Sequence, residues 1–342
     1  MKAIRIHEHG GPNRLVSEDL PSRPIRGDEA RVRIRAAGLN HLDLWVRRGI
    51  PGVRFPLPII PGSDAAGVVE QLGRDGTPFA QGDRVAVAPG ISCGLCEECL
   101  AGRDNLCRDY GILGESRDGT CSEEIVVPLR NLIPIPASLS FEDAAAIPLV
   151  FLTAWQMVVD RASVRHGETV LVLGAGSGVG SAAVQIARLQ GARVIAVSGS
   201  ASKLAKAREL GAEEGIDLSR SHLREEVRRI TDRRGADVVI EHVGKATWES
   251  SVACLARGGR LVTCGATTGA DVSLNLRQVF FKNLSILGST MGRRSHLFTI
   301  FRHVEAGRLL PVVDRVLSLD RISEAHRLLE ERGVFGKIIL TT

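Results

Sequence analysis

Four of the seven cysteines of this chain lie within one short segment, where they could bind a metal. The segment reads ISCGLCEECLAGRDNLC, and its cysteines, Cys93, Cys96, Cys99 and Cys107, are separated by two, two and seven residues. Thiolates at this spacing can surround one Zn²⁺ tetrahedrally, and four sulfur ligands leave no position for water, so the metal would be structural. Four cysteines also suit an iron–sulfur cluster. The spacing therefore predicts a metal centre and leaves both metals open.

The segment at residues 169–190, TVLVLGAGSGVGSAAVQIARLQ, has the pattern of a strand, a glycine-rich turn and a helix. Its apolar run at residues 170–173 is typical of a strand buried on both faces. The turn contains Gly174, Gly176, Ser177, Gly178 and Val179. Its backbone N–H groups and the N-terminus of the helix would face a pyrophosphate. Val179 stands where the G-x-G-x-x-G pattern has its last glycine, but the segment still predicts a dinucleotide site.

The end of the next strand, expected at residues 193–197, indicates which dinucleotide binds. NAD sites place an acidic residue about 20 positions beyond the glycines, where it accepts the ribose hydroxyls. This chain has Ser198, Gly199, Ser200 and Lys203 there instead. These residues offer hydroxyls, backbone N–H groups and one cation, which suit a 2′-phosphate, so we expect NADPH rather than NADH. The alternative is that Ser202 only caps the helix that follows.

Composition limits the class of protein. The 342 residues are enough for two domains, and 44% hydrophobic with 24% charged residues is ordinary for a globular enzyme with a small-molecule substrate. The 44 basic residues are interspersed with 39 acidic ones, so the net charge of +5 does not indicate a nucleic-acid partner. No apolar run reaches the roughly 18 residues of a membrane span, and the start is strand-like. We therefore expect no membrane association and a cytoplasmic location.

The expected elements change in kind along the chain. Short strands, such as residues 3–7 and 31–35, dominate the beginning, with a short helix over residues 40–48. A helix over residues 141–161 leads into the glycine-rich segment. Strands at 193–197, 237–240, 260–264 and 285–288 then alternate with helices at 202–210, 222–231 and 246–256. This alternation predicts an α/β fold with a doubly wound parallel sheet. The tail, with helices at 297–305 and 322–331 and a strand at 337–340, is assigned to the first domain.

The β-rich beginning, the four-cysteine segment, the glycine-rich turn and the closing GKIIL together resemble the medium-chain dehydrogenase/reductase superfamily from end to end. The resemblance implies a GroES-like catalytic domain, residues 1–152 plus 293–342, interrupted by a Rossmann domain, residues 153–292. It places the active site in the cleft between them. The cysteine segment, about residues 91–108, is similar to the structural zinc lobe of zinc-containing alcohol dehydrogenases. One structural Zn²⁺ per chain is therefore expected in place of an iron–sulfur cluster.

The chain departs from those alcohol dehydrogenases where they hold a second, catalytic zinc. Asn40 stands at the position of their cysteine ligand, Ser63 at that of a histidine, and Asp64 replaces the glutamate that follows it. The third ligand region, residues 144–155, contains no Cys, His, Asp or Glu. Asn and Ser are poor Zn²⁺ ligands, and one carboxylate does not hold a catalytic zinc. The positions of the proton-relaying hydroxyl and imidazole are also changed, to Leu42 and Trp45.

What remains resembles the quinone oxidoreductase and enoyl reductase branch of the superfamily. That branch has asparagine at the position of Asn40 and transfers hydride from NADPH without a metal. We therefore expect hydride delivery to the β-carbon of an enone, an enoyl thioester or a quinone, with Asn40 stabilising the enolate. Alternatives are a zinc-type alcohol dehydrogenase and a non-catalytic NADPH-binding protein.

The resemblance assigns further roles. Thr153 would touch the nicotinamide as a catalytic and cofactor-binding residue, and Asp43 would brace Asn40 or pair with Lys337. Other expected cofactor contacts are His41, Val243, Gly265, Ala266, Ser289, Thr290 and Lys337. The superfamily pairs the edge strand at residues 285–288 across a two-fold axis, so a homodimer or homotetramer is expected.

Overall fold

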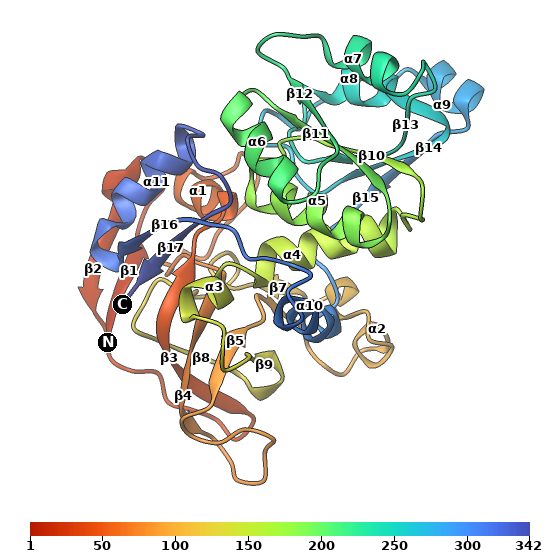
Figure 1. Cartoon of the computed structure of the whole chain (residues 1–342). Helices are drawn as coiled ribbons and strands as arrows, with labels where there is room; N and C mark the ends of the chain where they lie inside the picture. Colours follow the sequence, from red (N-terminus) through yellow and green to blue (C-terminus); the bar gives the residue numbers. More distant parts are fainter. The chain divides into compact units, whose positions relative to one another are not determined.

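The computed structural model describes all residues, 1–342, and divides them into two compact units (Figure 1). The first unit contains Met1–Leu149, Arg293–Gly307 and Pro311–Thr342. The second contains Val150–Gly292 with Arg308–Leu310. None of the helices combines the length and the apolar character that crossing a bilayer requires.

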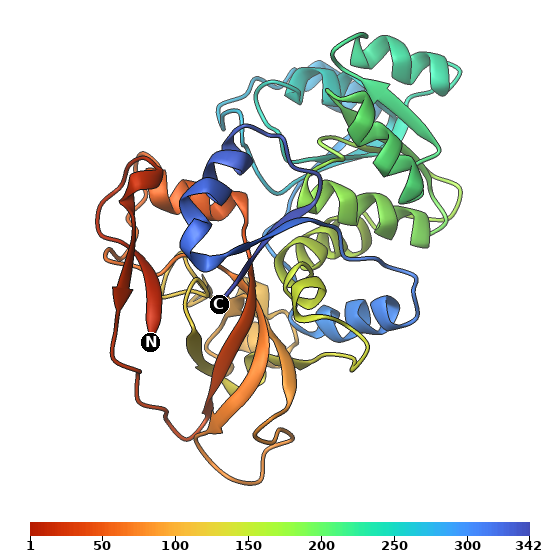
Figure 2. The same ribbon diagram turned by 60° about the vertical axis from the view of Figure 1, so that its left-hand side comes forward.

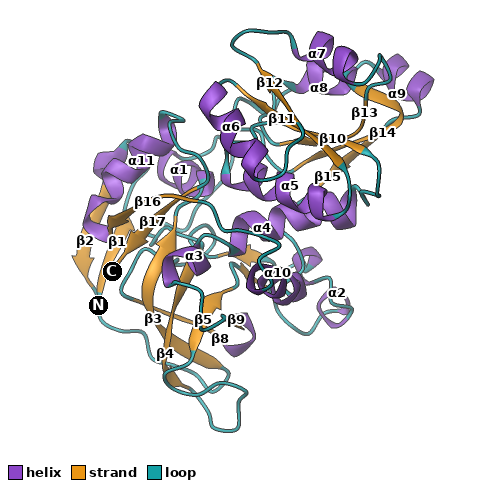
Figure 3. Ribbon diagram, in the orientation of Figure 1, coloured by secondary structure: helices purple, strands orange, loops and turns teal.

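The first unit is built mainly from strands (Figure 3). Its strands are β1 (Lys2–Ile6), β2 (Leu15–Asp19), β3 (Glu29–Gly38), β4 (Asp64–Leu72), β5 (Arg84–Val87), β6 (Gly90–Ile91), β7 (Gly111–Ile112), β8 (Glu124–Pro128), β9 (Leu132–Pro134), β16 (Val313–Ser318) and β17 (Lys337–Thr341). Its helices are α1 (His41–Arg48), α2 (Glu97–Leu100), α3 (Phe141–Ala145), α10 (Ser295–Glu305) and α11 (Ile322–Glu330).

One sheet organises this unit, with strand order β16-β17-β3-β4-β5-β9 and β8 paired to β3. The period-2 pattern of β3 is real, because Val32 and Ile34 are fully buried while Arg33 between them is exposed. The C-terminal strand β17, dark blue in Figure 2, runs antiparallel to β3. Gly38 at the end of β3 lies opposite Ile339 of β17 and Asp64 of β4. The ends of three strands therefore meet at one place.

The second unit is a parallel sheet with the order β12-β11-β10-β13-β14-β15. Its strands are β10 (Thr169–Val172), β11 (Arg193–Ser198), β12 (Glu214–Asp217), β13 (Ala236–Glu241), β14 (Leu255–Thr263) and β15 (Ser285–Gly288). Its helices are α5 (Gly178–Leu189), α6 (Ala201–Glu209), α7 (Leu223–Ile230), α8 (Trp248–Ala253) and α9 (Leu276–Lys282). In Figure 1, α5 and α6 lie on one side of these strands and α7, α8 and α9 on the other, which confirms the doubly wound arrangement.

Several element boundaries differ from the sequence-based expectation. The helix expected over residues 141–161 is interrupted: α3 ends at Ala145, α4 (Pro148–Trp155) begins at a proline, and a π-helical turn, Gln156–Arg161, follows. The helix expected over residues 246–256 is wrong at its end. There the chain has already become β14, because Leu255 pairs with Ala236. The strands β12 and β16 and the helix α9 were not predicted.

Candidate functional site

Most of the residues expected to contact the cofactor lie at the C-terminal ends of the strands of the parallel sheet, whereas His41, Thr153 and Lys337 lie on α1, α4 and β17. Parallel strands share their C-terminal ends, so segments that follow different strands meet there. The glycine-rich turn follows β10, Gly199 follows β11, Val243 follows β13, Gly265 and Ala266 follow β14, and Ser289 and Thr290 follow β15. The hydroxyl of Ser289 is buried and has no partner in the structure. The structure thus brings these residues together at the C-terminal ends of the strands. The Ser289 hydroxyl among them is free to bind a ligand.

The glycine-rich turn has room for a ligand only because side chains are missing. A Cβ on Gly176 would lie 2.7 Å from Cδ of Lys203. Gly174 has a φ of +56° and a Cβ on it would lie 2.9 Å from His242. Gly180, one residue beyond Val179, allows the helix to approach, because its Cβ would lie 2.2 Å from the Gly174 carbonyl oxygen. The close-packing glycine is therefore at 180, which explains why valine is accepted at 179.

The helix after the turn begins with a hydrogen-bonded cap. Ser177 is the N-cap of α5, and its hydroxyl accepts a hydrogen bond of 2.9 Å from the Gly180 N–H. The N–H groups of the first turn of a helix of this length favour an anion. This arrangement suits a dinucleotide pyrophosphate.

The segment after β11 lacks a carboxylate. Ser198 is the last residue of β11 and is 9% exposed. The next helix, α6, begins at Ala201 with Ser200 as N-cap, so the alternative interpretation, in which Ser202 caps this helix, was wrong. The Ser200 and Ser202 hydroxyl oxygens are 2.9 Å apart.

Two buried residues at the end of β13, Glu241 and His242, were not identified from the sequence. The Glu241 carboxylate accepts hydrogen bonds from the N–H groups of Val243 and Gly244 and from the hydroxyls of Thr247 and Ser251. It therefore fixes the loop that carries Val243. An acidic residue closing the apolar run VVIE was the available signal. His242 lies beneath Gly174, and burial lowers its pKa.

The four cysteine sulfurs of the first unit fit a tetrahedral metal. Bonds of about 2.3 Å to one Zn²⁺ hold sulfur atoms about 3.8 Å apart. Cys93 Sγ lies 3.5 Å from Cys107 Sγ and 3.9 Å from Cys99 Sγ, and all four sulfurs, including that of Cys96, lie within 4.8 Å of one another. N–H groups of Leu95 and Cys96 lower the pKa of the Cys93 thiol to about 6, whereas burial and hydrogen bonds with the other thiols raise the pKa of Cys96 to about 11.

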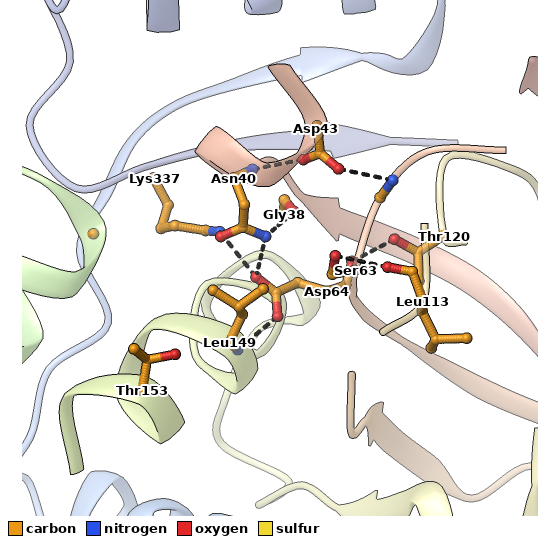
Figure 4. A network of polar contacts seen from close by, with 12 residues as sticks. Gly38, Asn40, Asp43, Ser63, Asp64, Leu113, Thr120, Leu149, Thr153 and Lys337 are labelled. Atoms are coloured by element: carbon orange, nitrogen blue, oxygen red, sulfur yellow. Dashed lines mark hydrogen bonds and ion pairs between the residues drawn. The ribbon is translucent and has the colours of Figure 1, made fainter. Parts of the chain in front are cut away.

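Asn40 lies at the centre of a buried polar network in the same unit (Figure 4). Its side-chain oxygen accepts a hydrogen bond of 2.5 Å from Lys337 Nζ, and its Nδ2 donates to Asp64 Oδ2 at 2.9 Å and to the Gly38 carbonyl at 3.3 Å. Lys337 also forms an ion pair of 2.9 Å with Asp64 Oδ2, and their side chains are 4% and 0% exposed. The other Asp64 oxygen accepts the Leu149 N–H at 2.7 Å. These polar groups are paired with one another, and their side chains are almost completely buried.

Two residues near Asn40 shape the backbone around this network. Gly38 lets neighbouring groups approach the chain closely, and Asp43 holds the backbone through hydrogen bonds. A Cβ on Gly38 would lie 2.4 Å from the Ala145 carbonyl oxygen and 3.2 Å from Cε of Lys337. Asp43 accepts the backbone N–H of Asn40 at 2.7 Å and that of Gly62 at 2.9 Å. Burial raises the pKa of Asp43 to about 6, against these hydrogen bonds, which lower it. Of the two expected roles, Asp43 therefore braces Asn40, while Lys337 pairs with Asp64.

The remaining predicted residues are less closely connected. The Ser63 hydroxyl donates to the Leu113 carbonyl at 2.8 Å. His41 is the first residue of α1, on the same helix as Leu42 and Trp45. Thr153 is buried on α4 in the second unit, where its hydroxyl lies 4.0 Å from the Met291 sulfur.

Comparison with known proteins agrees with this fold. A family model described as "Alcohol dehydrogenase GroES-like domain" matches residues 26–137, and one described as "Zinc-binding dehydrogenase" matches residues 178–306. An "NAD-dependent alcohol dehydrogenase" of Sulfurisphaera tokodaii is 32% identical, over 99% of both chains. A "Quinone oxidoreductase" of Pongo abelii is 29% identical, over 99% of this chain and 97% of its own. A crystal structure of an "NAD-dependent alcohol dehydrogenase" superposes with a TM-score of 0.96 at 52% identity, covering 100% of both chains.

A GroES-like unit combined with a Rossmann unit defines a class of two-domain dehydrogenases and reductases. The chain belongs to the medium-chain dehydrogenase/reductase superfamily, and it is an oxidoreductase.

Proposed function

We propose that the protein is an NADPH-dependent reductase that delivers hydride to an activated C=C bond, of an enone or enoyl thioester, or to a quinone, without a catalytic zinc. The observation that carries this proposal is the ion pair of Lys337 with Asp64, joined by Asn40. Asn40 and Asp64 are at positions that resemble those around the catalytic zinc of alcohol dehydrogenases, and both bind an ammonium group. The family resemblance to quinone oxidoreductases supports the same reaction.

The donor set does not fit a catalytic metal. Zinc needs three protein ligands in addition to water, with nitrogen, sulfur or carboxylate donors. The Asp64 carboxylate already accepts three hydrogen bonds, and Ser63 donates to a backbone carbonyl. A divalent cation close to Asp64 would also be repelled by the Lys337 ammonium.

Without a metal, the protein must stabilise negative charge through hydrogen bonds. Conjugate reduction places that charge on a carbonyl oxygen remote from the carbon that receives hydride, and preorganised N–H donors in a desolvated site stabilise it well. We assign this role to the Asn40 Nδ2. Its hydrogen bond to Gly38, at 3.3 Å, is longer than the usual 2.9–3.0 Å, so this N–H is the one most easily transferred to a substrate oxygen.

The cofactor would be held by the second unit. Gly174, Gly176 and the N-terminus of α5 would hold the pyrophosphate, and Ser198, Ser200 and Lys203 the 2′-phosphate. When bound, NADPH supplies the hydride. The lack of an acidic residue at the end of β11 supports NADPH over NADH. In the first unit, we propose that Cys93, Cys96, Cys99 and Cys107 hold one structural Zn²⁺, which their sulfur spacing fits.

A zinc-type, NAD-dependent alcohol dehydrogenase is the second candidate, because a solved relative with 52% identity carries that name. A screen separates the two. The protein is incubated with NADPH or NADH and with enones, enoyl thioesters or quinones, and in parallel with NAD⁺ or NADP⁺ and alcohols, while its zinc content is measured. We expect reduction of at least one unsaturated class with NADPH and one zinc per chain. Alcohol oxidation with two zincs per chain would establish the second candidate.

We also propose that the chain forms at least a homodimer through β15. This strand is an edge of the parallel sheet, and the neighbouring helix α9 exposes Leu276, Phe280 and Phe281 by 68%, 59% and 65%. Open edges and apolar patches of this kind are covered in most stable proteins. Light scattering at micromolar concentration should give at least twice the mass of 36.7 kDa, and a stable monomer would contradict the proposal.

A further inference from the structure

The hydrogen bonds of Asn40 fix which way its amide group points. An Asn side chain can exchange its oxygen and nitrogen by a half turn, and only its partners decide between the two orientations. At Asn40 the oxygen faces the Lys337 ammonium, which can only donate, and the nitrogen faces the Asp64 carboxylate. The reversed amide would point N–H groups at the ammonium and its oxygen at the carboxylate. Two charge-assisted hydrogen bonds would become two repulsive contacts.

The orientation determines what the site offers a substrate. With the oxygen held by Lys337 and one N–H held by Asp64, the group left for a ligand is the second N–H, now on the Gly38 carbonyl. An N–H donor suits a carbonyl or enolate oxygen. It does not suit the hydroxyl hydrogen of an alcohol, which needs an acceptor.

We propose that Lys337 is a positioning residue that locks the Asn40 amide, so that the site presents a hydrogen-bond donor to the oxygen of the substrate. This inference rests on the proposed reductase function. Lys337 comes from β17 and Asp64 from β4, both paired with β3, and Asn40 is the N-cap of α1, two residues beyond the end of β3. Regular elements of the first unit therefore position all three side chains.

The lock has to be separated from a simpler role, in which Lys337 only neutralises Asp64. Lys337→Met removes the ammonium but keeps the length of the side chain, and it leaves Asp64 buried with no counter-charge. We expect a lower melting temperature and a kcat reduced roughly ten- to a hundred-fold, with little change in the NADPH dissociation constant. A wild-type kcat in this variant would overturn the proposal.

The double variant Lys337→Met with Asp64→Asn distinguishes the two roles. It removes both members of the Lys337–Asp64 ion pair, so neither leaves an unpaired buried charge, and the melting temperature should recover toward that of the wild type. The oxygen of the amide introduced by Asp64→Asn would still accept the hydrogen bond from the Leu149 N–H. The nitrogen of that amide would then face Asn40, so the Asn40 amide would no longer prefer the orientation in which it presents an N–H to the substrate. We expect kcat to stay low. If kcat recovers together with stability, Lys337 acts only by charge neutralisation and the proposal is wrong.

A measurement without substrate keeps this inference separate from the proposed reaction. In ¹H–¹⁵N spectra, the Asn40 side-chain amide should be protected from solvent exchange in the wild type and lose that protection in Lys337→Met. If the wild type reduces none of the tested substrates but shows this protection, the reaction is wrong and the lock stands. An unchanged Asn40 amide signal in Lys337→Met would refute the lock.

Discussion

The substitution Asn40→Asp tests the network directly, because it replaces one atom that donates a hydrogen bond with one that repels. In the wild type, Asn40 Nδ2 lies 2.9 Å from Asp64 Oδ2, and the two residues are 6% and 0% exposed. Two carboxylate oxygens at that distance would repel by roughly 6 kcal/mol at an effective dielectric constant of about 20. Lys337 supplies only one positive charge. We therefore expect the pair of carboxylates to retain one proton, with a raised pKa.

The pH dependence follows from that raised pKa. A carboxyl whose pKa is higher in the folded than in the unfolded protein contributes most stability at low pH and loses it as pH rises. The melting temperature of Asn40→Asp, relative to the wild type, should thus fall between about pH 5 and pH 8. The helix cap is not the cause, because Asp is as good an N-cap residue as Asn.

We expect Asn40→Asp to impair turnover more strongly than it impairs the stability of the fold. The variant has lost the N–H that we assign to the enolate, so kcat should fall by roughly a hundred- to a thousand-fold at pH 7.5. The assay is NADPH consumption with the best unsaturated substrate over this pH range, with Asn40→Ala as the uncharged control. Asn40→Ala should also lose kcat but show no added pH dependence of the melting temperature. Wild-type turnover of Asn40→Asp throughout the range would remove Asn40 from the mechanism.

Three further predictions concern other parts of the chain. Cys99→Ser should lower both the melting temperature and the zinc content, which elemental analysis measures. Turnover per folded molecule should change little, since a four-thiolate site has no position for substrate. A large loss of turnover in fully folded protein would contradict this prediction. Ser198→Asp should shift the ratio of kcat/KM for NADPH and NADH by about tenfold or more toward NADH, and an unchanged ratio would show that β11 does not select the cofactor. Burial, with help from Arg47 and Arg48, lowers the pKa of His326 to about 3, so the folded protein keeps it neutral while the unfolded chain takes up a proton below about pH 6.5. Between pH 7 and pH 5, the wild type should therefore lose roughly 2 kcal/mol of unfolding free energy because of this residue. Denaturant titrations at the two pH values should show a correspondingly smaller loss for His326→Gln. Equal losses in the two proteins would show that His326 is protonated in the folded state.

The features that the sequence predicts well are local in the chain. The glycine-rich turn and its flanking strand and helix follow from consecutive residues, and the cysteine spacing alone brings four sulfurs together. The polar edge strand β12, with the sequence EGID, has no apolar pattern to identify it. Leu255 and Ala256 have the composition of a helix end, but pairing of Leu255 with Ala236 makes them the beginning of β14. In that case tertiary pairing outweighs local propensity.

The Asn40 network could be predicted only in part. The resemblance to the superfamily singled out Asn40, Asp43 and Lys337. The need for glycine at position 38 became clear only from the structure, where the Ala145 carbonyl and the Lys337 side chain pack against it. The hydrogen bond between Lys337 and Asn40 joins residues 297 positions apart, so no local pattern contains it. The sequence left open whether Asp43 would brace Asn40 or pair with Lys337. The strand register, which places Asp64 opposite Gly38, selects Asp64.

The position of Lys337 on β17, which comes after the whole second unit in the chain, also bears on synthesis of the protein. A ribosome releases the chain from its N-terminus, and domains generally fold as units while synthesis continues. The contiguous part of the second unit, Val150–Gly292, is synthesised before β17. Asn40 and Asp64 are synthesised earlier still, long before Lys337. During that time the Asp64 carboxylate has no lysine to pair with. A chain terminated just before Lys337 would therefore keep its second unit and lack the ammonium, so the network can assemble only after β17 has been made.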